Sequence, residues 1–494
     1  MDRPSAIKAL HDTRVWDVVI IGGGATGLGC AVDAAARGYK TLLIDQGDFA
    51  QGTSSRSTKL IHGGLRYLRQ GKLALVREAL RERGLLMRNA PHLVKPLDFV
   101  VPCHAWWERP FYEWGVRCYD RLAAELALDR SRWITRDETI GRLPTIAAKG
   151  LRGGVLYRDA QFDDARLAIA LALTFTSLGG TPLNYMRLTE LLKTRGKISG
   201  IVATDLESGE EIDLGAKVVI NATGAACDGV RQLDEPRATP MIAPSQGAHI
   251  VLDRSFLPGD TALMVPRTSD GRVLFAIPWH GRTLIGTTDT PVKEIAAEPR
   301  PLAAEIEFLL AHTAQHLSKA PTRADVLSCF AGVRPLVRSG AARNTAALSR
   351  DHTVTISPAG LVTIAGGKWT TYRHMAEDAV NAAASSAGLP ARSSVTDKLP
   401  FANLPAMGSR EPLHPRLDVR VGEIVAAARR EMARTVADAL SRRSRALLLD
   451  VRASIEIAPR VAAIMAAELG RNESWQREQV EAFTALAAGY LPCG

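Results

Sequence analysis

The sequence predicts an α/β fold, and three observations support this prediction. A strand–turn–helix–strand pattern occupies residues 17–45, near the N-terminus. In two later segments, residues 217–226 and 352–383, a buried strand again stops at small residues. The chain also changes from strands and turns in residues 240–348 to helical periodicity after residue 412. We therefore expect an N-terminal unit to which the chain returns twice, a sheet domain between the returns and a helical C-terminal domain.

The N-terminal unit carries the glycine pattern of a dinucleotide site. Residues 18–21 are a β-branched run typical of a buried parallel strand, and the pattern G-x-G-x-x-G follows them. Gly22 permits the tight turn, Gly24 lets the backbone approach a pyrophosphate, and Gly27 lets the next helix pack on the strand. A second strand stops at Asp45, whose carboxylate can accept a hydrogen bond from a ribose hydroxyl. A glycine-rich surface turn would not explain this acid, so we interpret the unit as a Rossmann dinucleotide-binding motif.

Composition indicates a globular enzyme of two or three domains. The 494 residues are 46% hydrophobic and 23% charged. The formal net charge is +10, but the basic residues are spread along the chain without interleaved aromatics, which argues against nucleic acid. The six cysteines show neither a C-x-x-C metal pattern nor a disulfide framework, so we expect reduced thiols and no metal site. We expect neither a standard secretion signal nor a membrane-spanning helix, because no eighteen-residue apolar stretch occurs.

Residues 65–143 are expected to lead away from the N-terminal unit. Leu73, Val76 and Leu80 recur at helical spacing among arginines, which predicts an amphipathic helix. We interpret residues 99–143 as a helical and loop excursion, in which aromatics are more often core than site; it contains Trp106, Trp107 and Trp114.

The chain then approaches the N-terminal unit again. Asp163 and Asp164 can cap a helix over residues 165–178, and the pattern of residues 198–214 predicts a hairpin. These two acids are interpreted as structural.

Both returns end at small residues. The strand of residues 217–222 stops at Thr223 and Gly224, and the strand of the second return stops at Gly366 and Gly367. A helix is expected to begin near Trp369. Glycines at such points allow a ligand to approach the backbone closely.

Eight motifs, spread in order over nearly the whole chain, resemble those of one enzyme family. They are GGGATG, TSSRSTKLIHGGLRYL, QFDDARL, NATG, IPWHGRTLIGTTDT, AGVRPL, SRD and GGKWTTYRHMAEDAV. The chain resembles the flavin-dependent glycerol-3-phosphate dehydrogenase family, and the C-terminal EMARTVADALSRRSRALLLD is similar to the helical domain of its members. The long insertion of some glycerol-phosphate oxidases is absent, which favours a dehydrogenase.

The resemblance implies a glutathione-reductase-like, FAD-binding Rossmann fold with a sheet-based substrate domain and a C-terminal helical domain. The implied boundaries are residues 15–75, 150–235 and 350–385 for a discontinuous FAD-binding domain, 76–149 for the excursion, 236–349 for the substrate domain and 408–494 for the helical domain.

The implied reaction is oxidation of sn-glycerol 3-phosphate to dihydroxyacetone phosphate by hydride transfer to FAD, with electrons passed to membrane quinone. The implied location is cytoplasmic, with peripheral attachment to the inner face of the cell membrane. A homodimer is also compatible with the resemblance. FAD also fits the residues better than NAD, because a long two-part cofactor needs the two later returns.

The cofactor-binding residues implied by the motifs come from all three segments of the FAD-binding domain. They are Gly22, Gly24, Gly27, Asp45, Thr53, Ser54, Ser55, Lys59, His62, Thr223, Gly224, Gly367, Lys368 and Thr370. Lys368, at the start of a helix, could stabilise negative charge on the reduced flavin.

The substrate phosphate is a dianion, which calls for arginine forks. The residues expected to bind substrate are Arg66, Tyr67, Arg334 and Arg350. His62 and His249 are both candidates for the base, and a histidine in such a loop is as often a prop for the flavin. The expected catalytic residues are therefore Arg334, Lys368, His62 and His249.

Two other functions are compatible with the same motifs. One is a flavoenzyme acting on another polyol phosphate or an amine, because specificity resides in the substrate domain. The other is a non-catalytic nucleotide-binding protein, against which the joint presence of Arg334 and Lys368 argues.

Two segments are candidates for attachment to a membrane. One is an arginine-rich helix over residues 429–445, which follows a linker of residues 384–407, and the other is the excursion around Trp106 and Trp107. For either segment, a plain solvated face is the alternative.

Overall fold

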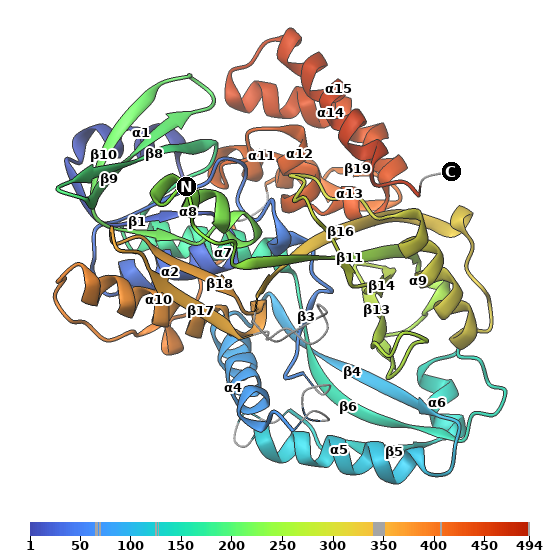
Figure 1. The fold of residues 1–494 in the computed structure, drawn as a ribbon. Helices are drawn as coiled ribbons and strands as arrows, with labels where there is room; N and C mark the ends of the chain where they lie inside the picture. Colours follow the sequence, from blue (N-terminus) through green and yellow to red (C-terminus); the bar gives the residue numbers. More distant parts are fainter. Residues whose placement is uncertain are drawn as a thin grey trace.

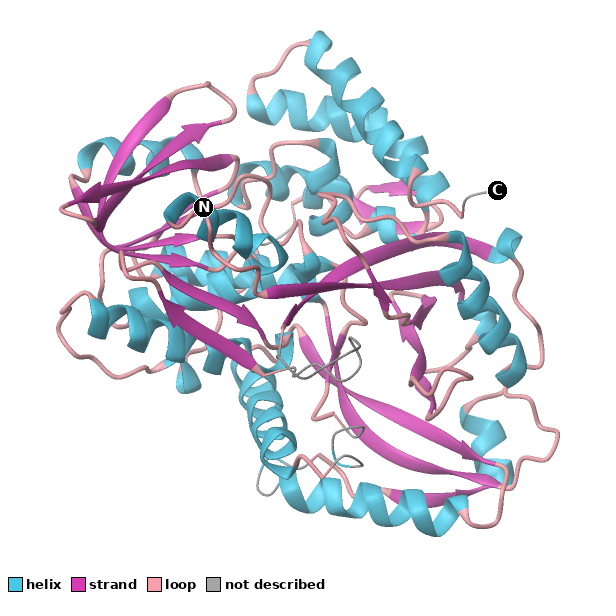
Figure 2. Ribbon diagram, viewed as in Figure 1, coloured by secondary structure: helices cyan, strands magenta, loops and turns pink. Residues whose placement is uncertain are grey.

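The computed structural model describes residues 1–64, 68, 71–123, 126, 128–338, 351–405 and 408–492. Among these residues the strands form two large sheets and one small hairpin, and helices at the C-terminal end form a third layer (Figures 1 and 2). None of the described helices is long and apolar enough to cross a membrane.

The first sheet contains the predicted N-terminal unit and both returns. Its strand order is β17-β18-β10-β1-β2-β7, and a hairpin of β8 and β9 extends it at β10. The strands β18, β10, β1, β2 and β7 run parallel. The bounds are β1 (Val15–Ile21), β2 (Thr41–Ile44), β7 (Thr181–Leu183), β8 (Met186–Thr194), β9 (Lys197–Asp205), β10 (Glu211–Asn221), β17 (His352–Ile356) and β18 (Val362–Gly366).

Three helices pack against this sheet and against one another. They are α2 (Ala25–Ala36), α7 (Asp164–Ser177) and α10 (Tyr372–Ser386). Val19 and Ile20 are fully buried between the layers, as expected for a parallel strand covered on both faces. Asp163 caps α7 by accepting a hydrogen bond from the Arg166 backbone N–H, as the sequence predicts.

The second sheet has the order β15-β11-β14-β13-β12-β4-β6-β3, with β16 paired to β11 and β5 paired to β6. The bounds are β3 (Leu60–Ile61), β4 (Val94–Cys103), β5 (Arg132–Thr135), β6 (Gly153–Phe162), β11 (Ile242–Asp253), β12 (Thr261–Val265), β13 (Leu274–Trp279), β14 (Arg282–Gly286), β15 (Thr290–Pro291) and β16 (Val326–Val337). Four helices flank this half of the molecule: α4 (Leu73–Asn89), α5 (Glu108–Ala123), α6 (Arg136–Arg142) and α9 (Ala303–His316).

The second sheet corrects the expected boundaries. Residues 76–149 were expected to form helices and loops, yet β4 lies at the middle of this sheet, parallel to β12 and antiparallel to β6. The range 150–235 was expected to belong to the FAD-binding domain, yet it opens with β6 of the second sheet. These strands are specified by pairing over long sequence distances, which the local pattern does not reveal.

The C-terminal domain packs on the second sheet. Its elements are β19 (Pro412–His414), β20 (Leu417–Arg420), α11 (Val421–Arg430), α12 (Val436–Asp438), a π-helix, η9 (Ala439–Arg443), α13 (Ala446–Leu449), α14 (Val451–Leu469) and α15 (Glu473–Ala488). One hydrophobic core joins Phe330 of β16 to Leu447 and Ile457 of this domain.

The arginine-rich segment of residues 429–445 is not the amphipathic helix that was expected. The helix α11 ends at Arg430. The side chains of Arg442 and Arg443 are buried in ion pairs with Asp48, and the half-buried Arg445 pairs with Asp163. Both carboxylates come from the N-terminal part of the chain, so this segment faces inward at its C-terminal end.

Candidate active site

A groove of about 750 Å³ opens beyond the carboxyl ends of the parallel strands of the first sheet. This is the edge at which open α/β sheets bind ligands. The predicted residues that line the groove are Gly22, Gly24, Asp45, Thr53, Ser54, Thr223, Gly224, Gly367 and Lys368. The three segments expected to hold a dinucleotide therefore do meet.

The glycine turn has one residue that the fold needs and one that the groove needs. A Cβ on Gly27 would lie 1.8 Å from the carbonyl oxygen of Gly22, so the helix α2 can cross the turn only with glycine there. Gly24 caps the same helix with φ −82° and ψ −176°, a conformation open to any residue. A Cβ on Gly24 would lie at the groove wall, 3.1 Å from Ser54 Oγ. The cradle thus fits a pyrophosphate held close to the backbone.

Asp45 lies where a ribose would meet the groove. Its carboxylate accepts hydrogen bonds from the backbone N–H groups of Gly23, at 2.6 Å, and Gly47, at 2.8 Å. Burial raises the pKa of Asp45 to about 6 against the effect of these two donors. The carboxylate thereby ties the glycine turn to the loop that follows β2.

A second cavity of about 280 Å³ adjoins the groove and shares part of its wall. The residues common to both are Thr53, Arg56, Pro335, Gly366, Gly367, Lys368 and Trp369. The two cavities therefore lie side by side at the junction of the two sheets.

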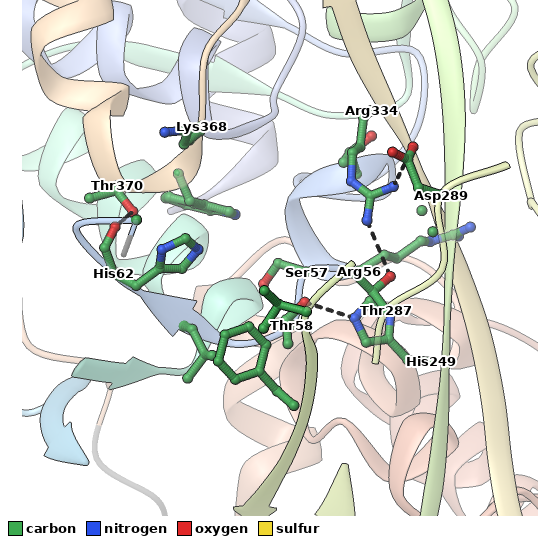
Figure 3. A pocket seen from close by; sticks show the side chains of 18 of the residues that line it. Arg56, Ser57, Thr58, His62, His249, Thr287, Asp289, Arg334, Lys368 and Thr370 are labelled. Atoms are coloured by element: carbon green, nitrogen blue, oxygen red, sulfur yellow. Dashed lines mark hydrogen bonds and ion pairs between the residues drawn. The ribbon is translucent and has the colours of Figure 1, made fainter. Parts of the chain in front are cut away.

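Arg334 lies on β16 in the wall of this second cavity (Figure 3). Its guanidinium group contacts Asp289 Oδ1 at 3.4 Å, Thr287 Oγ1 at 3.2 Å and the Thr288 carbonyl oxygen at 3.1 Å. A Cβ on Gly247 would lie 2.4 Å from Arg334 Nη2, so the guanidinium fits here only against bare backbone. The side chain keeps 22% of its surface exposed and lines the cavity.

His249 lies beside Arg334 and is 2% exposed. Its Nε2 is 2.9 Å from Thr58 Oγ1, and its ring stacks on Phe330 with centroids 4.9 Å apart. Burial, followed by the charges of Lys59 and Arg334, lowers the pKa of His249 well below its usual value. The imidazole is therefore neutral at physiological pH and can accept a proton.

His62, Lys368 and Thr370 lie across the cavity from Arg334 and His249 (Figure 3). Thr370 Oγ1 donates a hydrogen bond to the His62 carbonyl oxygen at 3.4 Å. Trp369, in the short helix η7 (Trp369–Thr371), donates from its indole N–H to the Ser54 carbonyl oxygen at 2.9 Å. This contact fixes the second return against the loop that carries Thr53 and Ser54.

Three of the expected cofactor residues do not line either cavity. Gly27 allows α2 to pack against the glycine turn. Ser55 is buried, and its carbonyl oxygen accepts a hydrogen bond from Lys59 Nζ at 2.6 Å. Lys59 itself is fully buried, with Nζ 2.8 Å from both carboxylate oxygens of Asp164. The expected contact of Lys59 with the cofactor is thus corrected, because this ion pair holds the ammonium group in the core. The expected substrate residues Arg66, Tyr67 and Arg350 lie outside the described residues.

The cavity also contains residues that the sequence interpretation missed. They are Arg56, Thr58, Thr287 and Asp289. Arg56 is 4% exposed, pairs with Glu298 and lines both cavities. All four lie inside the motifs TSSRSTKL and TLIGTTDT, but nothing in the local sequence separates them from neighbouring loop residues.

The combined site can bind an anion and remove a proton next to a dinucleotide groove. Arg334 supplies a fork for a phosphate or an oxyanion, and His249 supplies a neutral base. Among the described residues, no group of three or more His, Cys, Asp or Glu side chains is placed to hold a metal ion. The geometry therefore brings a guanidinium group and a neutral imidazole together beside the dinucleotide groove.

Comparison with known proteins gives two family matches. The family described as FAD dependent oxidoreductase matches residues 17–373, and the C-terminal domain of alpha-glycerophosphate oxidase matches residues 393–479. Together they cover the groove, the second cavity and most of the C-terminal domain.

Individual relatives point the same way. The mitochondrial glycerol-3-phosphate dehydrogenase of Bos taurus is 39% identical over 97% of this chain and 74% of its own length. The human mitochondrial enzyme of the same name is 38% identical over 97% of this chain and 74% of its own length. The glycerol-3-phosphate dehydrogenase of Bacillus halodurans, solved in complex with FAD, is 27% identical with a TM-score of 0.80, covering 100% of this chain and 98% of that one.

Proposed function

Because the chain belongs to the FAD-dependent glycerol-3-phosphate dehydrogenase family, we propose that it oxidises sn-glycerol 3-phosphate to dihydroxyacetone phosphate. The observation that carries this proposal is that the two cavities adjoin. Arg334 and the neutral His249 lie in a small chamber that shares a wall with the dinucleotide groove.

The residues of the groove would hold the cofactor along its length. Gly24 would leave room for the pyrophosphate, and Asp45 would accept a hydrogen bond from the ribose. When bound, FAD supplies the acceptor for the hydride that leaves C2 of the substrate.

The chamber residues would orient the alcohol and accept its proton. Arg334 binds the phosphate or the C2 oxygen through its fork. His249 accepts the proton of the C2 hydroxyl, directly or through the hydroxyl of Thr58, which contacts Nε2. Lys368 lines both cavities, so its positive charge can stabilise negative charge that develops at their junction.

Anaerobic bleaching of the flavin tests this function. We expect the purified holoenzyme to be yellow and to lose its visible absorbance when sn-glycerol 3-phosphate is added, but not when glycerol or erythritol phosphate is added. Bleaching by another polyol phosphate alone would assign a different substrate, and a protein without bound flavin would contradict the proposal.

We also infer that the electrons pass to quinone at a membrane surface, as the motif resemblance implies. The tryptophan-bearing candidate from the sequence supports this inference, because its aromatics are exposed. Trp106 is 75% exposed and Trp114 is 71% exposed, and Trp107 and Phe111 lie between them at 49% and 48%. Large exposed aromatics are unusual on a protein surface and partition into the membrane interface.

The same surface carries exposed arginines. Arg109 and Arg117 of α5 have side chains 56% and 66% exposed, and both pair with Glu113. The helix α5 lies at the edge of the molecule opposite α14 and α15 (Figure 1). An amphipathic helix of this kind binds an anionic surface by apolar burial and charge attraction. The enzyme would therefore attach peripherally at the inner face of the cell membrane.

The identity of the acceptor can be measured on the bleached enzyme. Under anaerobic conditions, a short-chain quinone should restore the flavin absorbance faster than oxygen does at equal concentration. Faster recovery with oxygen would identify an oxidase instead.

A further inference from the structure

We propose that the C-terminal domain positions the ribose-binding loop of the cofactor site through a buried arginine fork, formed by Arg443 and Arg442 on Asp48. This inference rests on the proposed FAD site and assigns the two arginines a positioning role for it. Neither arginine lines the groove, so any effect on the cofactor must pass through the loop.

Asp48 lies in the loop that follows β2 and is completely buried. Arg443 holds it in a bidentate fork, with Nη1 2.7 Å from Oδ2 and Nη2 2.8 Å from Oδ1. Arg442 Nε is 2.5 Å from Oδ2. Asn184 Nδ2 donates to Oδ1 at 3.1 Å, so donors surround the carboxylate. Such charge-assisted, two-point contacts fix orientation as well as distance.

The arginines are themselves held by the C-terminal domain. Both lie in the π-helix η9, and Arg443 Nη2 also donates to the Glu431 carbonyl oxygen at 2.8 Å. Arg442 Nη2 pairs with Asp438 Oδ1 at 2.6 Å. Burial alone would raise the pKa of Asp48, but the charges of Arg443 and Arg442 outweigh burial and lower it to about 2. The carboxylate therefore stays ionised, and the fork holds at any physiological pH.

The same loop forms a wall of the cofactor groove on its other side. Asp45, Gln46, Gly47 and Gln51 line the groove, whereas Asp48 faces away from it. Asp45 accepts from the Gly23 and Gly47 N–H groups, and the Ala50 N–H donates to the Gly23 carbonyl oxygen at 2.9 Å. The loop is thus fixed at both faces, by the glycine turn and by the arginine fork. Releasing the fork frees the carboxylate of Asp45 to move away from the ribose.

A second ion pair crosses the same domain boundary without touching this loop or the arginine fork. Arg434 binds Glu207, in the turn between β9 and β10, in a bidentate pair, with contacts of 2.6 and 2.7 Å. The two side chains are 17% and 21% exposed. Arg434→Met is therefore the control, because it removes a bidentate link between the domains while leaving the contacts of Asp48 and Arg443 intact.

The experiment measures FAD release from the holoenzyme by the rise of flavin fluorescence after dilution. Arg443→Met should release FAD at least about tenfold faster than the wild type, because breaking a buried pair leaves an uncompensated charge. ADP carries only the adenosine half of FAD. It should compete with FAD re-uptake less well in Arg443→Met than in the wild type, by a factor similar to the change in FAD release. At saturating FAD, kcat and the KM for sn-glycerol 3-phosphate should match the wild type.

Arg434→Met should lower the thermal midpoint while leaving FAD release and ADP competition at wild-type values. If Arg443→Met does not fold, Asp48→Asn takes its place, since the amide keeps the shape and loses the charge; it should show the same selective loss. Arg443→Lys keeps the charge without the fork and should retain FAD better than Arg443→Met. Equal FAD release and equal ADP competition in Arg443→Met and Arg434→Met would overturn the inference. A wild-type protein without flavin would instead overturn the proposed function.

Discussion

The guanidinium of Arg334 is the side chain through which the substrate's charge should be recognised. We predict that Arg334→Lys weakens catalysis although it keeps the charge, because an ammonium group cannot form the fork. Loss of a bidentate contact costs about 1.5–3 kcal/mol, or roughly ten- to a hundred-fold in kcat/KM. Steady-state kinetics with sn-glycerol 3-phosphate measure this loss.

Arg338 offers a matched control for this substitution. It follows β16, is exposed, and donates from Nε to the Ile242 carbonyl oxygen at 2.9 Å rather than into the cavity. Arg338→Lys should leave kcat/KM unchanged. Equal kinetics for wild type and Arg334→Lys would remove Arg334 from the substrate site.

His249 gives the site a predictable response to pH. Its pKa is lowered by burial, so the neutral base persists as pH falls through the range in which an exposed histidine would become protonated. The fall of kcat/KM on the acid side should therefore lie below pH 6.5. The substrate phosphate adds its own ionisation at about pH 6. His249→Gln should lose about 10²–10⁴-fold in rate and retain only the phosphate limb. An acid limb centred above pH 6.5, or an active His249→Gln enzyme, would show that the base lies elsewhere.

In the turn between β1 and α2, one glycine is required for folding and another for cofactor binding. Gly24→Val should fold normally and lose flavin, because its backbone conformation suits any residue while the side chain enters the groove. Gly27→Val should fail at the level of folding, because its Cβ would lie 1.8 Å from the Gly22 carbonyl oxygen. Circular dichroism and flavin absorbance on the two proteins distinguish the two defects. Normal flavin content in Gly24→Val would move the pyrophosphate out of this turn.

Elements specified by local pattern could be predicted from the sequence. The glycine turn, the cap of α7 at Asp163 and the hairpin of β9 and β10 all follow from periodicity and from turn and capping residues. The strand β4 could not be recognised, because Pro96 and Pro102 interrupt its pattern and its partners β6 and β12 lie far along the chain.

The site shows the same division between local and distant causes. Arg334 was identified because it lies in the motif AGVRPL, and His249 because an imidazole can accept a proton near neutral pH; the structure places both in one cavity. Lys59 was assigned to the cofactor because its partner Asp164, which comes from another segment, is invisible in the local sequence. The arginines of η9 looked solvent-exposed for the same reason, since Asp48 lies about 395 residues away.

At the scale of the whole molecule, the exposed aromatics beside and on α5 predict which face meets lipid. The protein should float with anionic liposomes at low salt and be released as salt screens the charges, each basic residue contributing about 1 kcal/mol near the surface. Trp106→Ser combined with Trp114→Ser should abolish flotation while keeping turnover with a water-soluble acceptor. Arg429→Gln combined with Arg430→Gln, in the other candidate segment, should float like the wild type. Flotation that survives the tryptophan changes would place the contact on a different face.

The strand order of the first sheet also determines how late in synthesis the cofactor groove can form. Ribosomes deliver β1 first, yet its neighbour β10 ends only at Asn221, and the next strand, β18, ends at Gly366. At roughly 5–20 residues per second, β18 emerges on the order of tens of seconds after β1. Arg443, which clamps the ribose-binding loop, emerges later still. A nascent chain therefore spends most of its synthesis with an unfinished pocket and bare strand edges, and flavin can be taken up only near the end of translation or after it.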